Sequence, residues 1–588
     1  MQGSLMAKPN PETLHLLYEA DDKPPHILSA IIGLQTVSMI IGGIVLTPVI
    51  VLSATDMKAS QADWAIFAAL VICGLTTIIQ ARPIGQFGSG YALFMGTSGP
   101  FIAISVLALN MGGLPLLGTL VIISALVQFL MAGNLSMFRA IITPTVRGTI
   151  ICMIALMVMP IGFEMVSSLP EGSDASPRSP MWIAILTVIV LLGISFYTSG
   201  QSRLWAPMIA LFTGYICAYY FGLVDFHKVV SAPIVGLPSN GWPGLDFSFS
   251  SSFWTLLPAF VIVTIVGTFQ TYDHAVAIQH ASSKTVGTTD YRLVEGAVNV
   301  DGLGNFLSGL ACTLPNTTYS TSVAILDITG VASRRVAIYG GLLLVVLAFF
   351  PKLSALLQSI PEPVLGGFVC PLMVFLFLHG IRLVISDGLP YDKALIFGIS
   401  FWIGLGFQNK QIFDGLLPQG LADFFGTGVT AGGTSAILLS LLITLKNKRL
   451  YQHIAELTDE GLFSSLAFVS NTAKQAGWTG KDLYRLTLAA EEAFIFLREN
   501  DNSKAGKLKL SVRLGPDEAT IELTSFAAGV NVETLIREMS SEQDPSSATD
   551  DDIRLAILQG VTADLKHEQF NEAEILRMTL LRETVRDI

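Results

Sequence analysis

The sequence predicts an all-α polytopic membrane protein with 14 transmembrane segments, arranged as two inverted repeats of seven and followed by a cytosolic α/β domain. Of its 588 residues 51% are hydrophobic and only 13% are charged, whereas soluble domains carry about 25% charged residues. Apolar runs fill residues 27–445, and the hydropathy pattern changes after residue 450. Two shorter, interrupted segments occupy matching places in the two halves of the membrane region.

The chain divides into three parts. Residues 1–26 lack a basic start followed by an apolar run, so we expect a cytosolic N-terminal segment and no secretory signal. Residues 27–445 are expected to form the transmembrane domain, and residues 451–588 a cytosolic domain. The loops predicted inside carry roughly twice as many Lys and Arg residues as the outer loops, which favours cytosolic termini in a cytoplasmic (inner) membrane.

The crossings are read from the length of the apolar runs, because a helix needs about 20 apolar residues to span the hydrocarbon core. Clear runs lie near 27–52, 62–80, 112–132, 147–162, 181–199, 204–222, 252–277, 295–312, 336–358, 365–384, 390–407 and 425–445.

The two remaining crossings are interrupted by Gly, Pro or hydroxyl residues: GYALFMGTSGPFIAISVLAL (90–109) and LPNTTYSTSVAILDITG (314–330). Each is the third crossing of its half, and such matching breaks indicate a transporter with inverted repeats. Non-helical backbone at membrane depth is tolerated where it is buried or lines a cavity. We therefore expect CTLPNTTYSTS (312–322) to line a polar cavity; the alternative is an outer loop before an ordinary helix.

The eighth crossing carries FQTYDHAVAIQH (269–280), where helical spacing places Gln270, Asp273 and His274 on one face. An Asp beside a His can bind and release a proton near neutral pH. Alternatively, these groups mark the cytosolic end of the span, where charges reach water.

Several motifs resemble the nucleobase–ascorbate transporters, also called the nucleobase:cation symporter-2 family, which includes uracil and xanthine permeases. The motifs are YEADDKPP (18–25), GLQTVSMIIGG (33–43), GTSGPFIA (96–103), VDGLGNFLSGLACTLPNTTYSTSVAILDITGVASRRVA (300–337) and SIPEPVLGG (359–367). The resemblance implies core and gate domains, short strands in crossings three and ten, and no enzymatic activity. It also implies secondary-active, proton-coupled (or Na⁺-coupled) alternating-access transport of a nucleobase such as xanthine or uracil, or of a similar heterocycle, by a homodimer.

The site departs from the family pattern. Gln270 stands where family members usually carry a carboxylate, and Thr321 and Ser322 stand where Glu, or Gln followed by Asn, is usual. An amide offers donors as well as an acceptor, so uracil recognition of the usual kind is not expected. Asp273 replaces a small residue, and we assign proton coupling to Asp273 and His274. The candidate substrate-binding residues are Gln270, Gly99, Phe101, Tyr319, Ser320, Thr321 and Ser322.

The C-terminal part reads as two amphipathic helices, a hairpin (KLKLSVRL, GPDE, ATIELTSF), a helix at 551–566 and a final strand AEILRMTLL. This order resembles the histidine-kinase-like ATPase fold of anti-sigma-factor kinases. Phe496 stands where that family has a magnesium-binding Asn, SFAAG (525–529) lacks the adenine-reading Asp, and SSATDDDIRLAI lacks a glycine-rich lid. We expect a degenerate regulator, with residual ATP–magnesium binding left open as the alternative.

The sequence thus predicts a transporter that needs no cofactor and binds no nucleic acid, and whose C-terminal domain contacts a cytosolic regulatory protein. The alternative is a transporter-like receptor that signals nucleobase availability through that domain. A carrier of sulfate or bicarbonate with the same repeat fold is disfavoured, because the two site motifs supply no cation for an anion.

Overall fold

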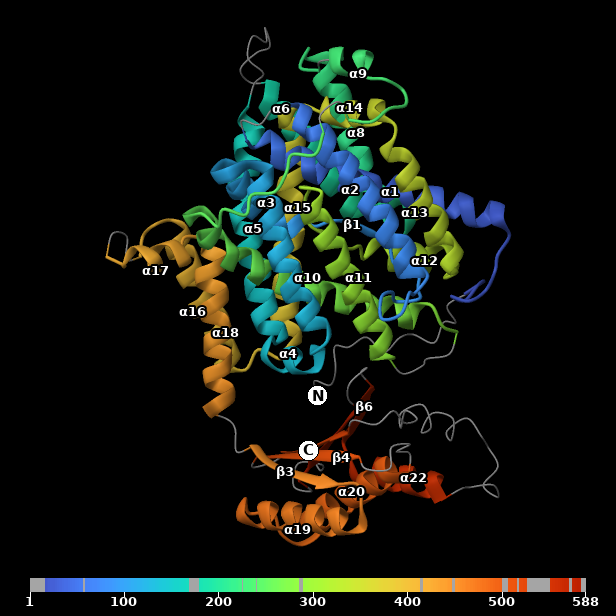
Figure 1. The fold of residues 1–588 in the computed structure, drawn as a ribbon, viewed down its shortest axis with the longest axis vertical. Helices are drawn as coiled ribbons and strands as arrows, with labels where there is room; N and C mark the ends of the chain where they lie inside the picture. The colour runs from blue at the N-terminus through green and yellow to red at the C-terminus, as the bar shows by residue number, and fades with distance from the viewer. Residues whose placement is uncertain are drawn as a thin grey trace. The chain divides into compact units, whose positions relative to one another are not determined.

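A computed structural model describes residues 16–582 except 56–58, 169–178, 225, 239–240, 285–288, 413–415, 447–449, 500–505, 516–517, 526–549 and 570–573. The chain forms two compact units, one of residues 1–284 and 296–442 and the other of residues 285–295 and 443–588. We call them the membrane unit and the C-terminal unit (Figure 1).

The first seven crossings use mostly single helices. They are α1 (His26–Ser53), α2 (Ala59–Ala81), β1 (Met95–Thr97) with the 3₁₀ turn η1 (Gly99–Phe101), α3 (Ile102–Ala132), α5 (Pro144–Ser167), α6 (Ser179–Tyr197) and α8 (Ala206–Tyr220). Helix α3 provides two crossings, because non-helical Gly113 (φ 71°) and Pro115 break it between residues of the third and fourth. Short helices α4 (Leu135–Ile141), α7 (Gln201–Leu204) and α9 (His227–Ser231) lie between the crossings.

The second seven crossings repeat the pattern. They are α10 (Ser251–Ala281), α11 (Tyr291–Leu310), β2 (Asn316–Thr318) with α12 (Thr321–Thr329), α13 (Arg334–Ala348), α15 (Glu362–Ser386), α16 (Tyr391–Gln408) and α18 (Gly428–Lys446). Helices α14 (Pro351–Gln358) and α17 (Gln419–Phe424) are short connections. Short strands therefore occur in both third crossings, as predicted.

Within the described residues, seven helices are long and apolar enough to span a membrane, or eight if the bent pair α13 and α14 counts as one span. Helix α8 and the apolar part of α18 are shorter apolar helices. The remaining crossings are the broken ones and those that carry polar residues, such as α11 with Asp301. Breaks shorten these crossings and polar residues lower their mean hydropathy, so a test of length and hydropathy misses them.

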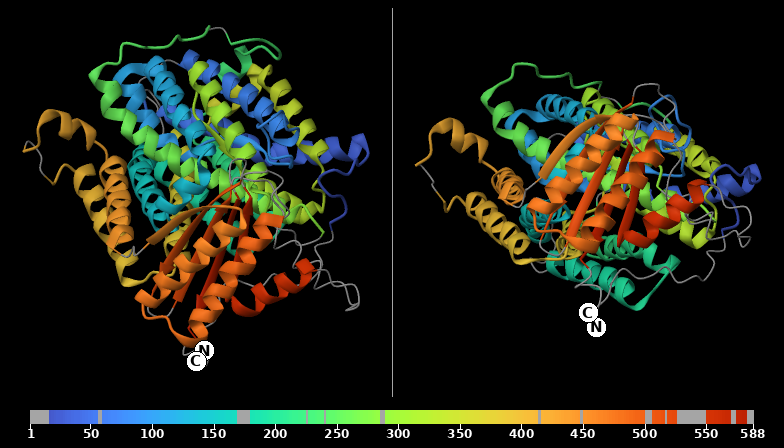
Figure 2. Two further views of the ribbon diagram at one scale, coloured as in Figure 1. Left: turned by 60° about the horizontal axis from the view of Figure 1, so that its bottom comes forward. Right: turned by 90° about the horizontal axis from the view of Figure 1, so that it is seen from below.

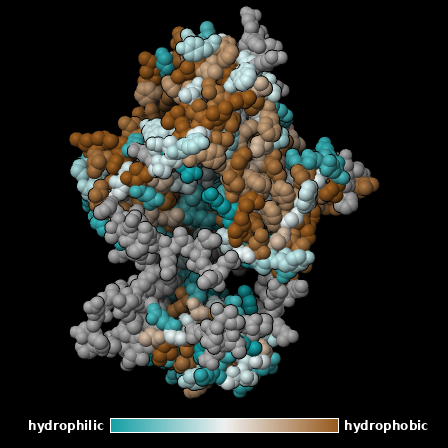
Figure 3. Space-filling view, turned by 180° about the vertical axis from the view of Figure 1, so that it is seen from behind, coloured by the Kyte–Doolittle hydropathy of each residue, from teal (hydrophilic) through white to brown (hydrophobic). Residues whose placement is uncertain are grey.

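The helices of the membrane unit pack in two groups. Helices α1, α2 and α13 pack together and α10 packs along α3, which makes the core domain. Helix α5 packs along α15, and α6 packs against both α8 and α15, which makes the gate domain. Hydrophilic residues lie set back within a mostly hydrophobic face of this unit (Figure 3).

Paired glycines lie at two close contacts between helices of the core. A Cβ atom on Gly74 of α2 would lie 2.5 Å from the carbonyl oxygen of Gly341 on α13. A Cβ atom on Gly118 of α3 would lie 2.7 Å from the carbonyl oxygen of Gly309 on α11. Small residues let membrane helices approach closely. Because inversion of the repeats exchanges these two helix pairs, the glycine contacts repeat with the fold.

The gate shows the same relation within a single helix pair. A Cβ atom on Gly148 of α5 would lie 2.4 Å from the carbonyl oxygen of Gly380 on α15. At the other end of the pair, a Cβ atom on Gly366 would lie 2.7 Å from the carbonyl oxygen of Gly162. Gly366 follows Gly148, and Gly380 follows Gly162, by the same number of residues. The inverted repeats therefore map one glycine contact onto the other, and their pseudo-two-fold axis passes between α5 and α15.

The C-terminal unit is an antiparallel sheet in the order β3-β4-β5-β7-β6, with α19 (Asp459–Gln475) and α20 (Gly480–Glu499) over one face (Figure 2). The strands are β3 (Leu450–Glu456), β4 (Lys507–Leu514), β5 (Glu518–Ser525), β6 (Asp564–Gln569) and β7 (Glu574–Leu581), and α22 (Asp550–Val561) precedes β6.

The helix expected at 551–566 is too long in the prediction. Helix α22 ends at Val561, and residues 564–569 form β6, paired in register with β7. The sequence DLKHEQ does not alternate between apolar and polar residues, so its periodicity does not predict a strand. Its strand conformation comes from pairing with β7. Strand β3 was likewise not among the predicted elements.

Candidate functional site

The two broken crossings meet as a pair of short strands. β1 and β2 are antiparallel, with Met95 opposite Thr318, Gly96 opposite Thr317 and Thr97 opposite Asn316. All six residues are buried. In Figure 1, β1 lies among the helices of the membrane unit. The two interrupted crossings, 90–109 and 314–330, are therefore in direct contact.

A helical turn begins just after each strand. η1 starts at Gly99 and leads into α3, and α12 starts at Thr321. The first N–H groups of a helix lack partners within the helix, and its N-terminus carries a partial positive charge. Two such ends beside one strand pair favour the binding of carbonyl oxygens or other electron-rich atoms.

Four of the predicted substrate residues lie at these helix starts. A Cβ atom on Gly99 would meet no atom within 4 Å, so the space beside it is open. Phe101 is 2% exposed, and its ring centre lies 5.9 Å from that of Phe260. Ser320 is exposed and Thr321 half-buried. Within the described residues, neither hydroxyl of this pair has a side-chain hydrogen bond.

Tyr319 and Ser322 join the two broken crossings to each other. The Tyr319 hydroxyl donates to the carbonyl oxygen of Thr97 at 3.0 Å. The Ser322 hydroxyl accepts from the Phe94 amide at 2.9 Å. A Cβ atom on Gly96 would lie 2.2 Å from Cζ of Tyr319, so the missing side chain of Gly96 makes room for this ring.

Helix α10 presents three polar residues beside the strands. Gln270 is half-buried, and its amide has no hydrogen-bond partner among the described residues. Asp273 Oδ2 lies 2.8 Å from Nη1 of Arg147 on α5. His274 Nδ1 lies 2.9 Å from the hydroxyl of Thr318 on β2. The structure thus brings the predicted α10 face next to β2 and leaves one amide free for a ligand.

A buried carboxylate that the sequence reading did not single out lies close to this face. Asp301 of α11 is 1% exposed. Its Oδ2 accepts from the Thr271 hydroxyl at 2.9 Å and from Gln128 Nε2 at 2.6 Å. Its Oδ1 has no hydrogen-bond partner among the described residues. An ionisable residue buried inside a membrane crossing is a functional candidate by default, and that signal was present in the sequence.

A chain of hydrogen bonds links His274 to Asp301. The hydroxyl of Thr318 contacts His274 on one side and the hydroxyl of Thr271, at 3.1 Å, on the other. Thr271 then donates to Asp301. If His274 carries its proton on Nδ1, every link points from the imidazole toward the carboxylate. Such a directed chain is able to move a proton between the two groups.

Further polar contacts hold Asp301 in place. Asn305 Nδ2 donates to Gln128 Oε1 at 2.8 Å, and Asn305 Oδ1 accepts from the Asn316 amide at 2.7 Å. Asn316 Nδ2 donates to the Thr76 hydroxyl at 3.0 Å. Residues from α2, α3, α11 and β2 therefore form one buried network, which fixes the strand pair relative to the carboxylate.

Among the residues that the structure describes, no group of three or more His, Cys, Asp or Glu side chains is arranged to hold a metal ion. In the C-terminal unit, Phe496 is fully buried in the hydrophobic core of the domain. Residues 526–529 of SFAAG and 546–549 of SSATDDDIRLAI lie outside the described residues.

Comparison with known proteins identifies relatives of the membrane unit. The family model Xan_ur_permease, described as "Permease family", matches residues 28–413. A putative purine permease of Clostridium perfringens, CPE0397, is 28% identical over 432 residues, which cover 73% of this chain and 93% of the relative. The xanthine permease XanP of Escherichia coli K12 is 26% identical over 443 residues, covering 73% and 94%. The nucleobase transporter PlUacP of Paenibacillus larvae is 26% identical over 424 residues, covering 71% and 95%.

Solved structures with some similarity are anion transporters. Murine Slc26a9 in the inward-facing state aligns with a TM-score of 0.49 at 12% identity, covering 78% of this chain and 75% of that chain. The transmembrane domain of the cyanobacterial bicarbonate transporter BicA aligns with a TM-score of 0.43 at 16% identity, covering 72% and 99%.

The match over residues 28–413 includes both broken crossings, α10 and α11, and so all the groups of the site. The protein is therefore a transporter of the Xan_ur_permease family of permeases.

Proposed function

We propose that this protein carries a nucleobase or a similar small heterocycle across the cytoplasmic membrane by alternating access, coupled to protons. The observation that carries the proposal is the side-chain amide of Gln270, which has no hydrogen-bond partner among the described residues and lies beside a strand pair from opposite repeats and a buried carboxylate network. The names of the relatives, which are purine, xanthine and nucleobase transporters, support the substrate class.

Gln270 suits one edge of a heterocycle in particular. Its side-chain amide offers a donor and an acceptor side by side. A lactam edge, with a ring N–H next to a C=O, pairs with both through two hydrogen bonds. The positive ends of the helix dipoles at the starts of η1 and α12 favour the oxygen or nitrogen acceptors of the ring. The open space beside Gly99 allows the ligand to approach the backbone.

Phe101, Tyr319, Ser320, Thr321 and Ser322 complete the proposed substrate site. The half-buried Tyr319 ring offers an apolar face to a planar ligand, whereas Phe101, packed against Phe260, supports the site from its buried position. Ser320 and Thr321 supply hydroxyls without side-chain partners in the described structure, whereas Ser322 acts on the ligand through the backbone that it holds. Ser320 and Thr321 are therefore assigned to direct contact with the ligand, and Ser322 to a supporting role.

Proton coupling is assigned to Asp273 and His274, with Asp301 as the buried end of the chain that starts at His274. Two donors on Oδ2 stabilise the carboxylate of Asp301, and the free Oδ1 offers a place for a proton. Substrate binding beside Gln270 would change the hydration of His274, one turn away. Sodium coupling is the alternative that the test below separates.

The test is uptake into proteoliposomes with competition by a panel of purines and pyrimidines. We expect accumulation driven by an inward proton gradient and not by a sodium gradient, and competition by bases that carry a lactam edge. Gln270→Glu should shift the competition profile toward rings with two adjacent N–H donors. Asp301→Asn should abolish accumulation while binding persists. Saturation at one ligand per protein, without accumulation, would instead identify a receptor.

The wider assignments belong to the same proposal. We infer an inner-membrane location with both termini cytosolic, supported by the basic residues of the predicted inner loops. A homodimer and a cytosolic regulatory partner for the C-terminal unit complete it. Light scattering of the purified protein measures the first, and affinity capture with the full chain against a chain ending at residue 446 measures the second.

The proposed role of the C-terminal unit is regulation without binding of ATP and magnesium. A fully buried Phe496 offers no magnesium ligand at the position where kinases of this type have Asn. Isothermal titration of the full chain with ATP and magnesium tests this assignment, and saturable binding would contradict it.

A further inference from the structure

Arg147 and Asp273 form a charge pair between the two domains of the membrane unit. Arg147 lies in the first turn of α5, in the gate, and Asp273 lies on α10, in the core. Their Nη1 and Oδ2 atoms are 2.8 Å apart. Transport by alternating access requires one helical group to move against the other. A bond across that boundary therefore has to break and form again in each cycle.

The Arg147 side chain is less exposed than the side chains of a typical surface ion pair, and it has an aromatic contact in addition to its bond with Asp273. Its side chain is only 12% exposed, whereas that of Asp273 is 39% exposed. The guanidinium lies over the ring of Phe269, 4.9 Å from the ring centre, one helical turn from Asp273. Its Nε is buried without a hydrogen-bond partner among the described residues. Removal of Asp273 would leave this cation buried beside an aromatic face, which is costly.

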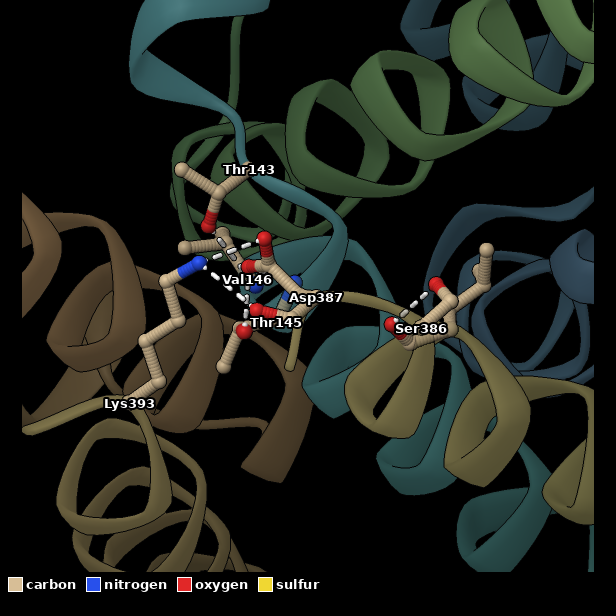
Figure 4. A network of polar contacts seen from close by, with 7 residues as sticks. Thr143, Thr145, Val146, Ser386, Asp387 and Lys393 are labelled. Atoms are coloured by element: carbon tan, nitrogen blue, oxygen red, sulfur yellow. Dashed lines mark hydrogen bonds and ion pairs between the residues drawn. The ribbon is translucent and has the colours of Figure 1, made fainter. Parts of the chain in front are cut away.

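The gate end of the pair is fixed by a second network, shown in Figure 4. The amide and hydroxyl of Thr145 both donate to Asp387 Oδ2, at 3.2 and 2.6 Å. Lys393 Nζ lies 2.6 Å from Asp387 Oδ1. Asp387 thus ties the start of α5 to the end of α15 and the start of α16. Arg147, two residues after Thr145, moves with the gate as one body.

We propose that Arg147 and Asp273 are an ionic latch that stabilises the present arrangement of core and gate and separates when the core moves. This goes beyond the assignment of substrate and coupling ion, and it gives Asp273 a role that does not require a proton. His379 of α15 interacts electrostatically with both Asp273 and Arg147, and also with Arg382 on its own helix.

The experiment measures the distance between core and gate directly. A ketone-bearing amino acid is incorporated at Asn134, at the end of α3, and at Tyr391, at the start of α16, and each is coupled to a nitroxide. Both positions are exposed, and the labelling does not involve the native cysteines. Double electron–electron resonance in nanodiscs then gives the populations of the arrangements for wild type, Arg147→Gln, Asp273→Asn and the double variant.

Each neutralisation should lower the ratio of the latched to the other arrangement by about tenfold, a size typical of directly interacting pairs. The double variant should show no larger change than either single one. The control is Asp21→Asn, which removes the 2.9 Å pair with Arg334 and leaves the domain boundary intact. It should match wild type.

The latch is refuted if the single variants keep the wild-type distribution, or if the effects of the two substitutions add. If Arg147→Gln does not give monodisperse protein, Asp273→Asn, which nearly keeps the shape of the side chain, carries the test. The proton role of Asp273 is tested separately, by measuring how uptake depends on the proton gradient. If Asp273 carries the proton, uptake by Asp273→Asn should lose this dependence, whereas uptake by Arg147→Gln should keep it. Failure of one assignment therefore leaves the other testable.

Discussion

Substitution by alanine should affect stability at Gly96 and substrate binding at Gly99, although the two glycines lie in one short segment. An alanine Cβ at position 96 would lie 2.2 Å from Cζ and 2.6 Å from Oη of Tyr319. The ring would have to move, and its hydrogen bond to the carbonyl oxygen of Thr97 would break. At position 99 no atom lies within 4 Å of the added Cβ.

The cost of Gly96→Ala follows from these contacts. Forcing a methyl group into a filled site costs about 1–3 kcal/mol, and the lost hydrogen bond adds about 1 kcal/mol. We therefore expect Gly96→Ala to destabilise the membrane unit by about 2–4 kcal/mol. Gly99→Ala should leave stability unchanged and weaken substrate binding, because its methyl group enters the space assigned to the ligand.

Thermal unfolding in nanodiscs, followed by intrinsic fluorescence with and without substrate, measures both effects. Stability of Gly96→Ala equal to that of wild type would show that Tyr319 does not need the space above Gly96. Equal destabilisation by the two variants would show that a methyl group at position 99 clashes with neighbouring atoms, contrary to the open space beside Gly99.

Three further predictions concern packing and charge elsewhere. Gly341→Val should lower the yield of folded protein, because its Cβ would lie 2.6 Å from the carbonyl oxygen of Gly74; Gly398→Val, at a glycine with open space, is the control for gel filtration. Phe496→Ala should destabilise the C-terminal unit by about 3–5 kcal/mol in a denaturant titration, since the ring is fully buried in its core. Burial raises the pKa of Glu492, against the opposing effect of Arg554. Glu492 therefore contributes favourably to the free energy of unfolding below its unfolded pKa of about 4.3, and this contribution is lost as pH rises through its higher folded pKa. Glu492→Gln should flatten that dependence when unfolding is measured from pH 4 to 8.

The broken crossings were predictable because composition alone marks them. Pro, Gly and hydroxyl residues within 90–109 and 314–330 cannot form ordinary lipid-facing helices, and their matching positions predict that they meet. The paired strands Met95–Thr97 and Asn316–Thr318 confirm this reasoning. The boundaries of the strands were not predictable, because three residues carry no usable periodicity.

The partners of the charged groups depend on contacts far apart in the sequence. Arg147 appears in the sequence as one of several basic residues near the inner ends of the helices, yet in the structure it is half-buried and packs against α10. Asp301 lies in a run that resembles the family, and only the rotation of α11 shows that it faces Thr271 and Gln128. Helix rotation is set by packing such as the paired glycines, which local sequence does not specify.

The strand pair at the centre of the membrane unit also constrains how the protein is made. Tyr319 and Thr97, joined by a hydrogen bond, are 222 positions apart in the chain. The backbone polar groups of β1 therefore lack their partner strand, in the bilayer or in the insertion machinery, until β2 in the second half has been synthesised. The nascent N-terminal half should consequently be a preferred client of membrane chaperones and proteases, and expression of residues 1–250 alone should give a short-lived product that a separately expressed second half stabilises.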